Sequence, residues 1–112
     1  MKKGSEVFVF GKDMAVTPAG EGVTRKVLGY SENMMVCEIR LEKGAVIPSH
    51  AHPHEQCSTM VYGKCMYRVG EDVREVGTGD SVMIAPDVLH DIVALEDCLV
   101  IDVFSPMRED FV

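Results

Sequence analysis

QCSTMVYGKCMYRVGEDVREVGTGD, residues 56–80, is the stretch that decides the fold class. It contains three short runs rich in β-branched, aromatic and other apolar residues, and each run ends at a turn that contains glycine. The runs and their turns are 56–62 with Gly63, 65–69 with 70–72, and 73–76 with 77–80. Glycine accepts the positive φ of tight hairpin turns, so this stretch predicts antiparallel strands.

The same pattern continues on both sides of this stretch, with turn signals roughly every eight to twelve residues. Further β-type runs are predicted at 7–10, 23–30, 34–41, 81–85, 90–95 and 98–104. No segment shows a helical period of useful length, and Pro106–Val112 is at most a short terminal turn. Many short strands with glycine-rich turns indicate an all-β sandwich or barrel.

Length and charge restrict the classes of function. The chain has 112 residues, which predicts a single domain over residues 1–112. Its formal net charge of −7 at pH 7 disfavours contact with phosphate backbones, so we expect no nucleic-acid partner. No apolar run approaches the ~20 residues needed to cross a bilayer, and no signal-peptide pattern is visible, so we expect no membrane association and a cytoplasmic location.

The four cysteines indicate core residues rather than a metal or redox site. Cys37, Cys57, Cys65 and Cys98 are widely spaced, and none belongs to a C-x-x-C pair. Each lies within an apolar run, where a thiol usually acts as a small hydrophobic side chain. We therefore expect four free cysteines.

A cluster of histidines is the strongest chemical signal. His50, His52 and His54 fall within five residues, and the remaining histidine, His90, begins another apolar run. In a strand, His50 and His52 share a face and lie about 7 Å apart. A solvated polar loop is the alternative, but imidazole is the commonest neutral ligand of first-row divalent metals, and His90 adds a third candidate. The pattern predicts a metal site.

The spacing around this cluster resembles that of the cupin superfamily. Residues 44–63 read G-x5-H-x-H-x3-Q-x6-G, which fits the first cupin motif with Gln56 at the position that is usually Glu. The second cupin motif is matched at Gly79 and His90, whereas Ala85, Asp87 and Ala94 replace its Pro, Gly and Asn. The resemblance implies a cupin-type jelly-roll β-barrel with its metal-binding motifs within residues 44–94.

Strand parity and the count to the motif's last glycine both favour Gln56 over Glu55 as a ligand. The predicted metal ligands are His50, His52, Gln56 and His90, holding one divalent transition metal ion, which could be nickel, zinc, iron or manganese. His54 and Glu55 are expected at the rim of the site or behind the ligands. Because all four ligands are neutral, the ion keeps its full charge, which favours an anionic substrate and Lewis-acid chemistry over oxygen chemistry.

The last apolar run contains one acid. Period-2 alternation places Val100, Asp102 and Phe104 on one face. If that face is interior, Asp102 shares a cavity with the metal and can act as a general acid or base. If the run is an edge strand, Asp102 faces water. The pattern leaves both possibilities open.

Three stretches resemble a narrower family, the pectin-degradation cupins named KdgF. They are VLGYSEN at 27–33, the stretch 50–56, and DVFSPMREDF at 102–111. Members of that family convert cyclic 4,5-unsaturated uronate monosaccharides from pectin or alginate breakdown into linear keto forms. The resemblance implies a metal-dependent ring-opening enzyme with a small anionic sugar substrate.

By the same resemblance, Asp102 and Arg108 are the predicted catalytic residues, and Phe104 and Arg108 the predicted substrate contacts. From the residues alone, Phe104 could equally be core and Arg108 a solvated tail residue. Other readings are a different cupin enzyme, such as a sugar isomerase or a dioxygenase, or a non-catalytic metal- or sugar-binding module. Small cupins commonly form homodimers, and an N-terminal strand at Val7–Phe10 could pair with a neighbouring sheet.

Overall fold

A computed structural model describes residues 4–112 of the chain, and within them the regular structure is almost entirely β. The strands are β1 (Thr17–Pro18), β2 (Val23–Tyr30), β3 (Met35–Leu41), β4 (Val46–His50), β5 (Glu55–Tyr62), β6 (Lys64–Val69), β7 (Asp72–Gly77), β8 (Ser81–Ile84), β9 (His90–Ala94) and β10 (Cys98–Ser105). Two single 3-10 turns, η1 (Gly11–Asp13) and η2 (Glu109–Phe111), complete the described part. None of its helices has the length and apolar character to cross a membrane.

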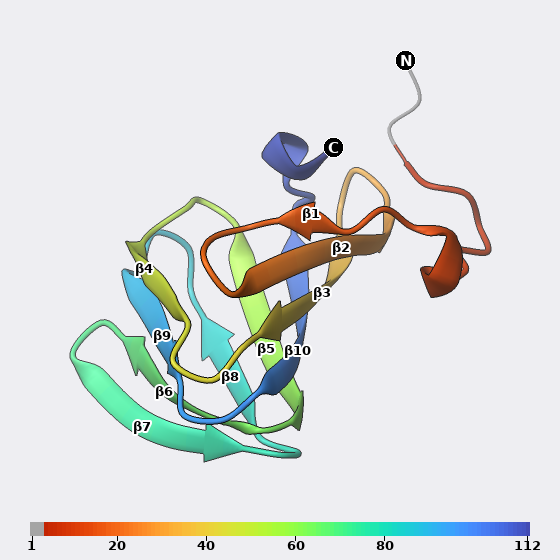
Figure 1. Cartoon of the computed structure of the whole chain (residues 1–112). Coiled ribbons are helices and arrows are strands. Elements are labelled where there is room, and N and C mark those ends of the chain that lie inside the picture. The colour runs from red at the N-terminus through yellow and green to blue at the C-terminus, as the bar shows by residue number, and fades with distance from the viewer. Residues whose placement is uncertain (1–3) are drawn as a thin grey trace.

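The strands form two antiparallel sheets that face each other (Figure 1). One sheet has the order β1-β2-β3-β10-β5-β8, and the other has the order β4-β9-β6-β7. The all-β class expected from the turn spacing is confirmed. Within residues 4–112 strand pairing runs inside each sheet and not between them, so the expected barrel takes the form of a two-sheet jelly roll.

The core lies between the two sheets. Strand β10 pairs with β3 on one edge and β5 on the other, and its alternate residues Cys98, Val100, Asp102 and Phe104 are buried. Strand β3 shows the same alternation, and the buried apolar residues of both sheets form one cluster. All four cysteines are free, and all are buried except the half-buried Cys57, as expected for core thiols.

The turn between β5 and β6 requires glycine. Gly63 has a φ of +94°, which side chains rarely adopt. A Cβ at this position would also collide with the carbonyl oxygen of Asp97 and lie 2.8 Å from Cα of Cys98. Gly63, the last glycine of the histidine motif, therefore allows the tight turn between β5 and β6. It also leaves room for Asp97 and Cys98, which lie against it at the start of β10.

The runs predicted from residue 23 onward are strands whose ends differ from the prediction by at most one residue. Two strands were not predicted. Strand β1 is only two residues long, and β4 is an edge strand that contains Pro48 and carries mostly exposed side chains, so neither shows an apolar alternation.

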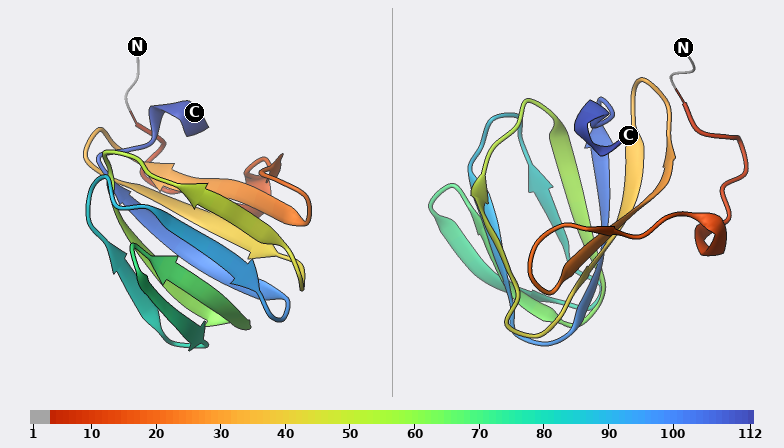
Figure 2. Two further views of the ribbon diagram at one scale, coloured as in Figure 1. Left: turned by 90° about the vertical axis from the view of Figure 1, so that its left-hand side faces the viewer. Right: turned by 45° about the horizontal axis from the view of Figure 1, so that its top comes forward.

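The strand predicted at Val7–Phe10 is wrong. This segment is an N-terminal arm that runs outside the two sheets (Figure 2). Ser5 donates its backbone N–H to Tyr30 at the end of β2, but no ladder follows over residues 6–16, although β1 covers only Thr24 and Arg25 on that edge of β2. Apolar residues form a strand only where a partner edge offers backbone groups.

The exposed arm is expected to mediate a homodimer. Val7, Phe8 and Phe10 are 93%, 78% and 62% exposed, and covering them with a second copy would remove apolar surface from water. Light scattering at micromolar concentration should give a dimer mass for the wild type and a lower mass for Phe8→Asp. Val73→Asp, at an exposed valine of β7, should behave like the wild type. A monomeric wild type would contradict the prediction.

Candidate metal centre

Three histidine side chains converge between the sheets. His50 ends β4 and pairs directly with His90 at the start of β9, while His52 lies in the turn between β4 and β5. One ring nitrogen of each lies within 4.8 Å of the others. The ring centroids of His50 and His90 are 4.2 Å apart, and those of His52 and His90 are 5.0 Å apart. This spacing lets all three imidazoles reach a single ion.

Each of these imidazoles is oriented by a hydrogen bond to the backbone. In every case Nδ1 faces a carbonyl oxygen two residues away, and these contacts are His50 to Pro48 at 2.8 Å, His52 to His54 at 3.1 Å, and His90 to Val88 at 2.9 Å. A carbonyl can only accept, so Nδ1 of His50 and of His90 carries the proton and donates it, whereas His52 has an acceptor oxygen beside each ring nitrogen. The lone pair of His50 and of His90 is then on Nε2, the arrangement usual for metal-binding histidines.

The protonation of these rings suits a metal ion. Nε2 of His90 is buried and has no hydrogen-bond partner among the described residues. Burial lowers the pKa of His52 and of His90, so these imidazoles remain neutral near pH 7. An unpaired buried nitrogen beside two other imidazoles is the donor set that a divalent first-row ion requires.

Gln56 supplies a fourth donor atom. Its Oε1 lies 3.0 Å from Nε2 of His52. If the proton of His52 is on Nδ1, as in His50 and His90, both of these atoms are acceptors, and a shared cation would stabilise their close approach. Bonds of about 2.1 Å at right angles place two ligand atoms about 3 Å apart. His50, His52, Gln56 and His90 therefore fit one divalent ion, and their assignment as ligands remains a prediction.

Behind Gln56 lies a buried polar network. Nε2 of Gln56 donates to Oγ of Ser58 at 3.1 Å, and Ser58 donates to Oδ1 of Asp102 at 2.6 Å. The Tyr67 hydroxyl lies 2.9 Å from Ser58 Oγ. Because the only hydroxyl hydrogen of Ser58 goes to Asp102, Tyr67 must donate. Burial raises the pKa of Tyr67, which keeps its phenol protonated for this role.

Asp102 faces the cavity. It is 7% exposed on an inner strand, so the edge-strand possibility is wrong and the interior one is correct. Burial raises the pKa of Asp102 to about 6, although hydrogen bonds from Ser58 and Gln56 favour its charged form. A carboxyl with this pKa can exchange a proton near neutral pH.

These groups border a cavity of about 270 Å³. Its polar lining consists of Arg25, His50, Gln56, Tyr67, His90, Asp102 and Arg108. The C-terminal segment contributes Arg108 and Phe111 to the lining, and η2 lies beside the β1–β2 end of the large sheet (Figure 1). The cavity therefore joins the candidate metal ligands, a buried carboxyl and the tail of the chain.

Comparison with known proteins agrees with this geometry. The Cupin_2 family model, described as a cupin domain, matches residues 37–104, which include the complete histidine cluster. The chain belongs to the cupin family. A curated relative, the pectin degradation protein KdgF of Dickeya dadantii (strain 3937), is 33% identical over 94 residues, which cover 82% of this chain and 86% of the relative.

Solved cupin structures superpose on almost the whole chain. An RmlC-like cupin from Shewanella frigidimarina NCIMB 400 has a TM-score of 0.94 and 37% identity, covering 98% of this chain and 99% of that one. KdgF from Halomonas sp. has a TM-score of 0.90 and 29% identity, covering 96% and 100%. The resemblance to pectin-degradation cupins expected from the sequence is confirmed.

Two predicted substrate contacts lie at the end of this cupin cavity. The Phe104 ring packs edge-on against His52 at a centroid distance of 5.8 Å. Cζ of Arg108 lies 5.1 Å from the centroid of Phe104 and 4.2 Å from that of Phe111. Arg108 also donates from Nε and Nη2 to the carboxylate of Asp110, at 3.0 and 2.9 Å. Its guanidinium is therefore held in place and partly neutralised within the chain.

His54 and Glu55 lie outside the cluster of donor atoms. The carbonyl of His54 accepts the hydrogen bond that orients His52, while its ring lines a different hollow together with Asp110. Glu55 is exposed at the start of β5. The argument from strand parity assumed a continuous strand, but β4 ends at His50 and β5 begins at Glu55, so the turn at 51–54 brings His52 into the site.

Sequence reasoning missed three residues that border the cavity or support its ligands. Ser58 shares the inner face of β5 with Gln56, and Tyr67 is buried on β6. Arg25 follows the buried Val23 at a spacing of two on β2, so it faces inward. Period-2 counting from buried neighbours could have identified each of them.

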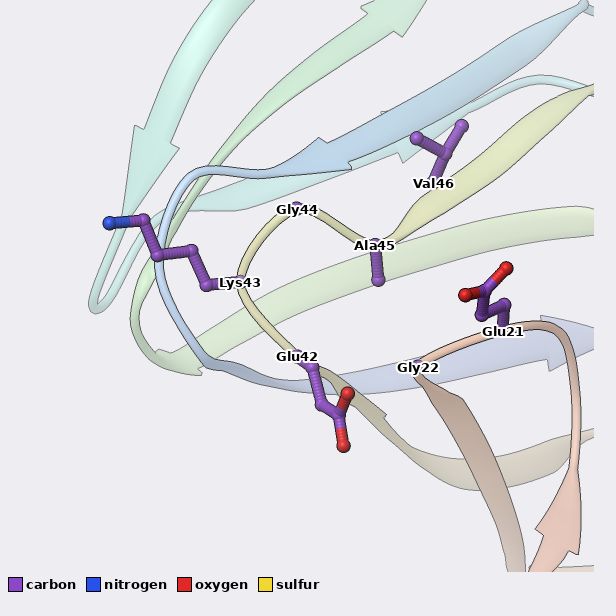
Figure 3. Close-up of a pocket in the computed structure, with 7 residues that line it drawn as sticks. All are labelled: Glu21, Gly22, Glu42, Lys43, Gly44, Ala45 and Val46. Carbon is purple, nitrogen blue, oxygen red and sulfur yellow. The ribbon is translucent and has the colours of Figure 1, made fainter.

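A second hollow lies between the β1–β2 and β3–β4 turns (Figure 3). It measures about 460 Å³ and is lined by Glu21, Gly22, Glu42, Lys43, Gly44, Ala45 and Val46. It contains no histidine, and the Lys43 side chain points away from it (Figure 3). This hollow therefore offers no imidazole to a metal ion.

Purified protein is expected to carry about one divalent first-row ion per chain. His50→Ala or His90→Ala should abolish this binding because each removes one of three convergent Nε2 atoms, whereas the control His54→Ala should retain the metal. Inductively coupled plasma mass spectrometry after dialysis measures the content. A wild type that stays metal-free after incubation with nickel, zinc, iron and manganese would contradict the assignment, as would an ion that binds through His54 and Glu55.

Ser58 is expected to position Gln56 for the metal. Ser58→Ala removes the acceptor that fixes the amide, so Gln56 can rotate its Nε2 toward the histidines, and metal affinity should fall by about 10- to 100-fold. Competition with a chromogenic chelator measures the affinity. Ser81→Ala, at an exposed serine that contacts Thr59, is the matched control. Equal affinities of the two variants would show that Ser58 does not position the ligand.

Proposed function

We propose that this cupin opens the ring of a 4,5-unsaturated uronate monosaccharide from pectin or alginate breakdown and produces the linear keto-uronate. The observation that carries the proposal is the convergence of three imidazoles beside Gln56, whose amide is linked through Ser58 to a buried carboxyl group, Asp102. The similarity to proteins named pectin degradation protein KdgF supports this choice of substrate.

The proposed reaction is an internal proton transfer with one bond cleavage. The substrate is a cyclic hemiacetal whose C4=C5 double bond is conjugated with the carboxylate. When the C1 hydroxyl loses its proton, C1=O forms and the C1–O5 bond breaks, leaving its electron pair on O5 as an enolate. A proton added at C4 then gives the C5 ketone. The product is an isomer of the substrate, so no oxidant or reductant is needed.

Asp102 is the group proposed to move this proton. Among the described residues it is the only carboxyl that lines the cavity. Ser58 donates to Oδ1 and holds the carboxyl in place, and this carboxyl would take the proton from the C1 hydroxyl and return it at C4. A divalent ion held by His50, His52, Gln56 and His90 would supply Lewis-acid stabilisation of the negative charge that develops on oxygen.

The remaining lining residues would bind and orient the sugar. Phe104 offers an apolar surface next to His52, against which a sugar ring can pack. Arg108 adds a positive charge, held in a fixed orientation by Asp110. The cavity of about 270 Å³ falls just below the usual range for drug-sized ligands, which favours a monosaccharide over an oligomer.

Asp102→Asn should lower turnover by about 10²- to 10⁴-fold, the usual contribution of a general acid–base group. Asn keeps the shape of the side chain but cannot take up the proton. The assay follows the loss of C4=C5 absorbance of an unsaturated uronate, with enzyme-free solution as the control because these sugars can open spontaneously. Metal content and thermal unfolding should match the wild type.

The same assay also distinguishes ring opening from the alternative functions. Asp91→Asn, at a half-buried aspartate of β9 that pairs with Arg68, is a matched control and should keep full activity. A wild type that does not exceed the enzyme-free rate would overturn the ring-opening proposal and leave a metal- or sugar-binding module. Oxygen uptake or turnover of a saturated sugar would instead indicate a dioxygenase or a sugar isomerase.

A further inference from the structure

An arginine faces the space between the sheets from the large sheet. Arg25 lies on β2 between Val23, which is 2% exposed, and the half-buried Val27, and it pairs across the ladder with Ile39 of β3. Side chains two apart on a strand share a face, so Arg25 points to the same side as Val23. It lines the cavity that contains the histidines. A cation at such a position needs a partner or a function.

Arg25 has an aromatic partner but no acidic one. Its Cζ lies 3.7 Å from the centroid of the Phe111 ring, so the guanidinium rests on the C-terminal turn η2. No carboxylate of residues 4–112 forms an ion pair with it. By contrast, Arg40 on the outer face of β3 pairs with Glu38 at 2.9 Å.

The two arginines of the cavity differ in what they can still bind. Arg108 already donates two hydrogen bonds from one edge of its guanidinium to the Asp110 carboxylate. Phe111 contacts the guanidinium of Arg25 through its π-face, which leaves the N–H donors of Arg25 in the guanidinium plane for a ligand. Arg25 is therefore the better candidate for bidentate binding of a carboxylate.

The charge of the cavity is opposite to that of the whole chain. The formal net charge is −7, yet among residues 4–112 the cavity lining contains two arginines and only one carboxyl, Asp102. A divalent ion on neutral ligands would make the cavity more positive still. An anion entering this cavity would meet its uncompensated positive charge at Arg25.

We propose that Arg25 is the specificity residue that binds the carboxylate of a small sugar acid, with Phe111 supporting its guanidinium. This assignment rests on the proposed function for the acidic sugar substrate. It leaves Arg108 as a contact to another part of the sugar, because Asp110 already occupies the edge of the Arg108 guanidinium that a carboxylate would use. The carboxylate would then lie between Arg25 and the metal cavity.

Binding of a non-reacting ligand pair tests the proposal without turnover. D-galacturonate and D-galactose differ by one carboxylate, and NMR titration of the zinc-loaded protein measures the affinity for each. Arg25→Gln should weaken galacturonate binding by about 10- to 100-fold, as expected for loss of a charged hydrogen-bonding group, and leave galactose binding unchanged. Arg25→Lys keeps the positive charge but cannot bind the carboxylate in a bidentate way, so its galacturonate affinity should fall less than that of Arg25→Gln.

Arg40→Gln is the matched control, because it removes an arginine from the outer face of the adjacent strand. Zinc content and thermal unfolding verify that each variant is folded. If Arg25→Gln does not fold, the galacturonate affinity of Arg25→Lys alone tests whether Arg25 binds the carboxylate. Equal loss of affinity for the acid and the neutral sugar would overturn the proposal. So would galacturonate affinity in the Arg25 variants equal to that of Arg40→Gln.

Kinetics with the unsaturated uronate separate this proposal from the proposed function. Arg25→Gln should raise KM with little change in kcat, because the carboxylate is bound equally in the ground state and the transition state. If the wild type turns over the uronate but KM is unaffected by Arg25→Gln, the ring-opening function stands and the role of Arg25 is refuted. If the wild type shows no turnover but Arg25→Gln loses galacturonate selectively, the role of Arg25 stands without that reaction.

Discussion

Strand β10 is hydrogen-bonded on both edges, and its register against β5 sets the positions of Asp102 and Phe104 relative to Gln56 and Ser58. Asp102 lies opposite Ser58, and Phe104 lies opposite Gln56. A shift of one residue would turn Asp102 to the outer face of the sheet and break its 2.6 Å contact with Ser58. Burial of Val100 and Phe104 on the same face opposes that shift, so the apolar core also fixes the polar network.

The smaller sheet fixes the histidines in a comparable way. His50 and His90 face each other across the β4–β9 ladder, and the carbonyls that orient their Nδ1 atoms belong to residues just before each of them. The rings are thus oriented by local backbone geometry and brought together by sheet pairing. A metal ion binding here would meet donors that are already aligned, which reduces the entropy lost on binding.

The sequence predicted these features to different degrees. Strands with clear alternation and glycine turns were predicted to within one residue, and the spacing from His50 to Gln56 identified the residues that converge. The Val7–Phe10 strand failed because an apolar run does not reveal whether the segment will pair with a sheet, and among the described residues of this arm only Ser5 bonds to the backbone of β2. The turn that brings His52 into the site depends on where β4 ends, which only the folded chain determines.

Gln56 stands where the first cupin motif usually has glutamate, and the hydrogen bonds among Gln56, Ser58 and Asp102 explain why an amide suits this position. Ser58 has one hydroxyl hydrogen and donates it to Asp102, so any other close neighbour of its oxygen must be a donor. Gln56 meets this requirement through Nε2 and presents Oε1 to the histidines, whereas a glutamate carboxylate would have no proton to offer Ser58. Two carboxylates would then compete for one hydrogen in a buried space, which raises the pKa of one of them. With the amide at this position, Asp102 is the only carboxyl among the described residues that lines the cavity, and a divalent ion on neutral ligands would keep its positive charge for an anionic substrate.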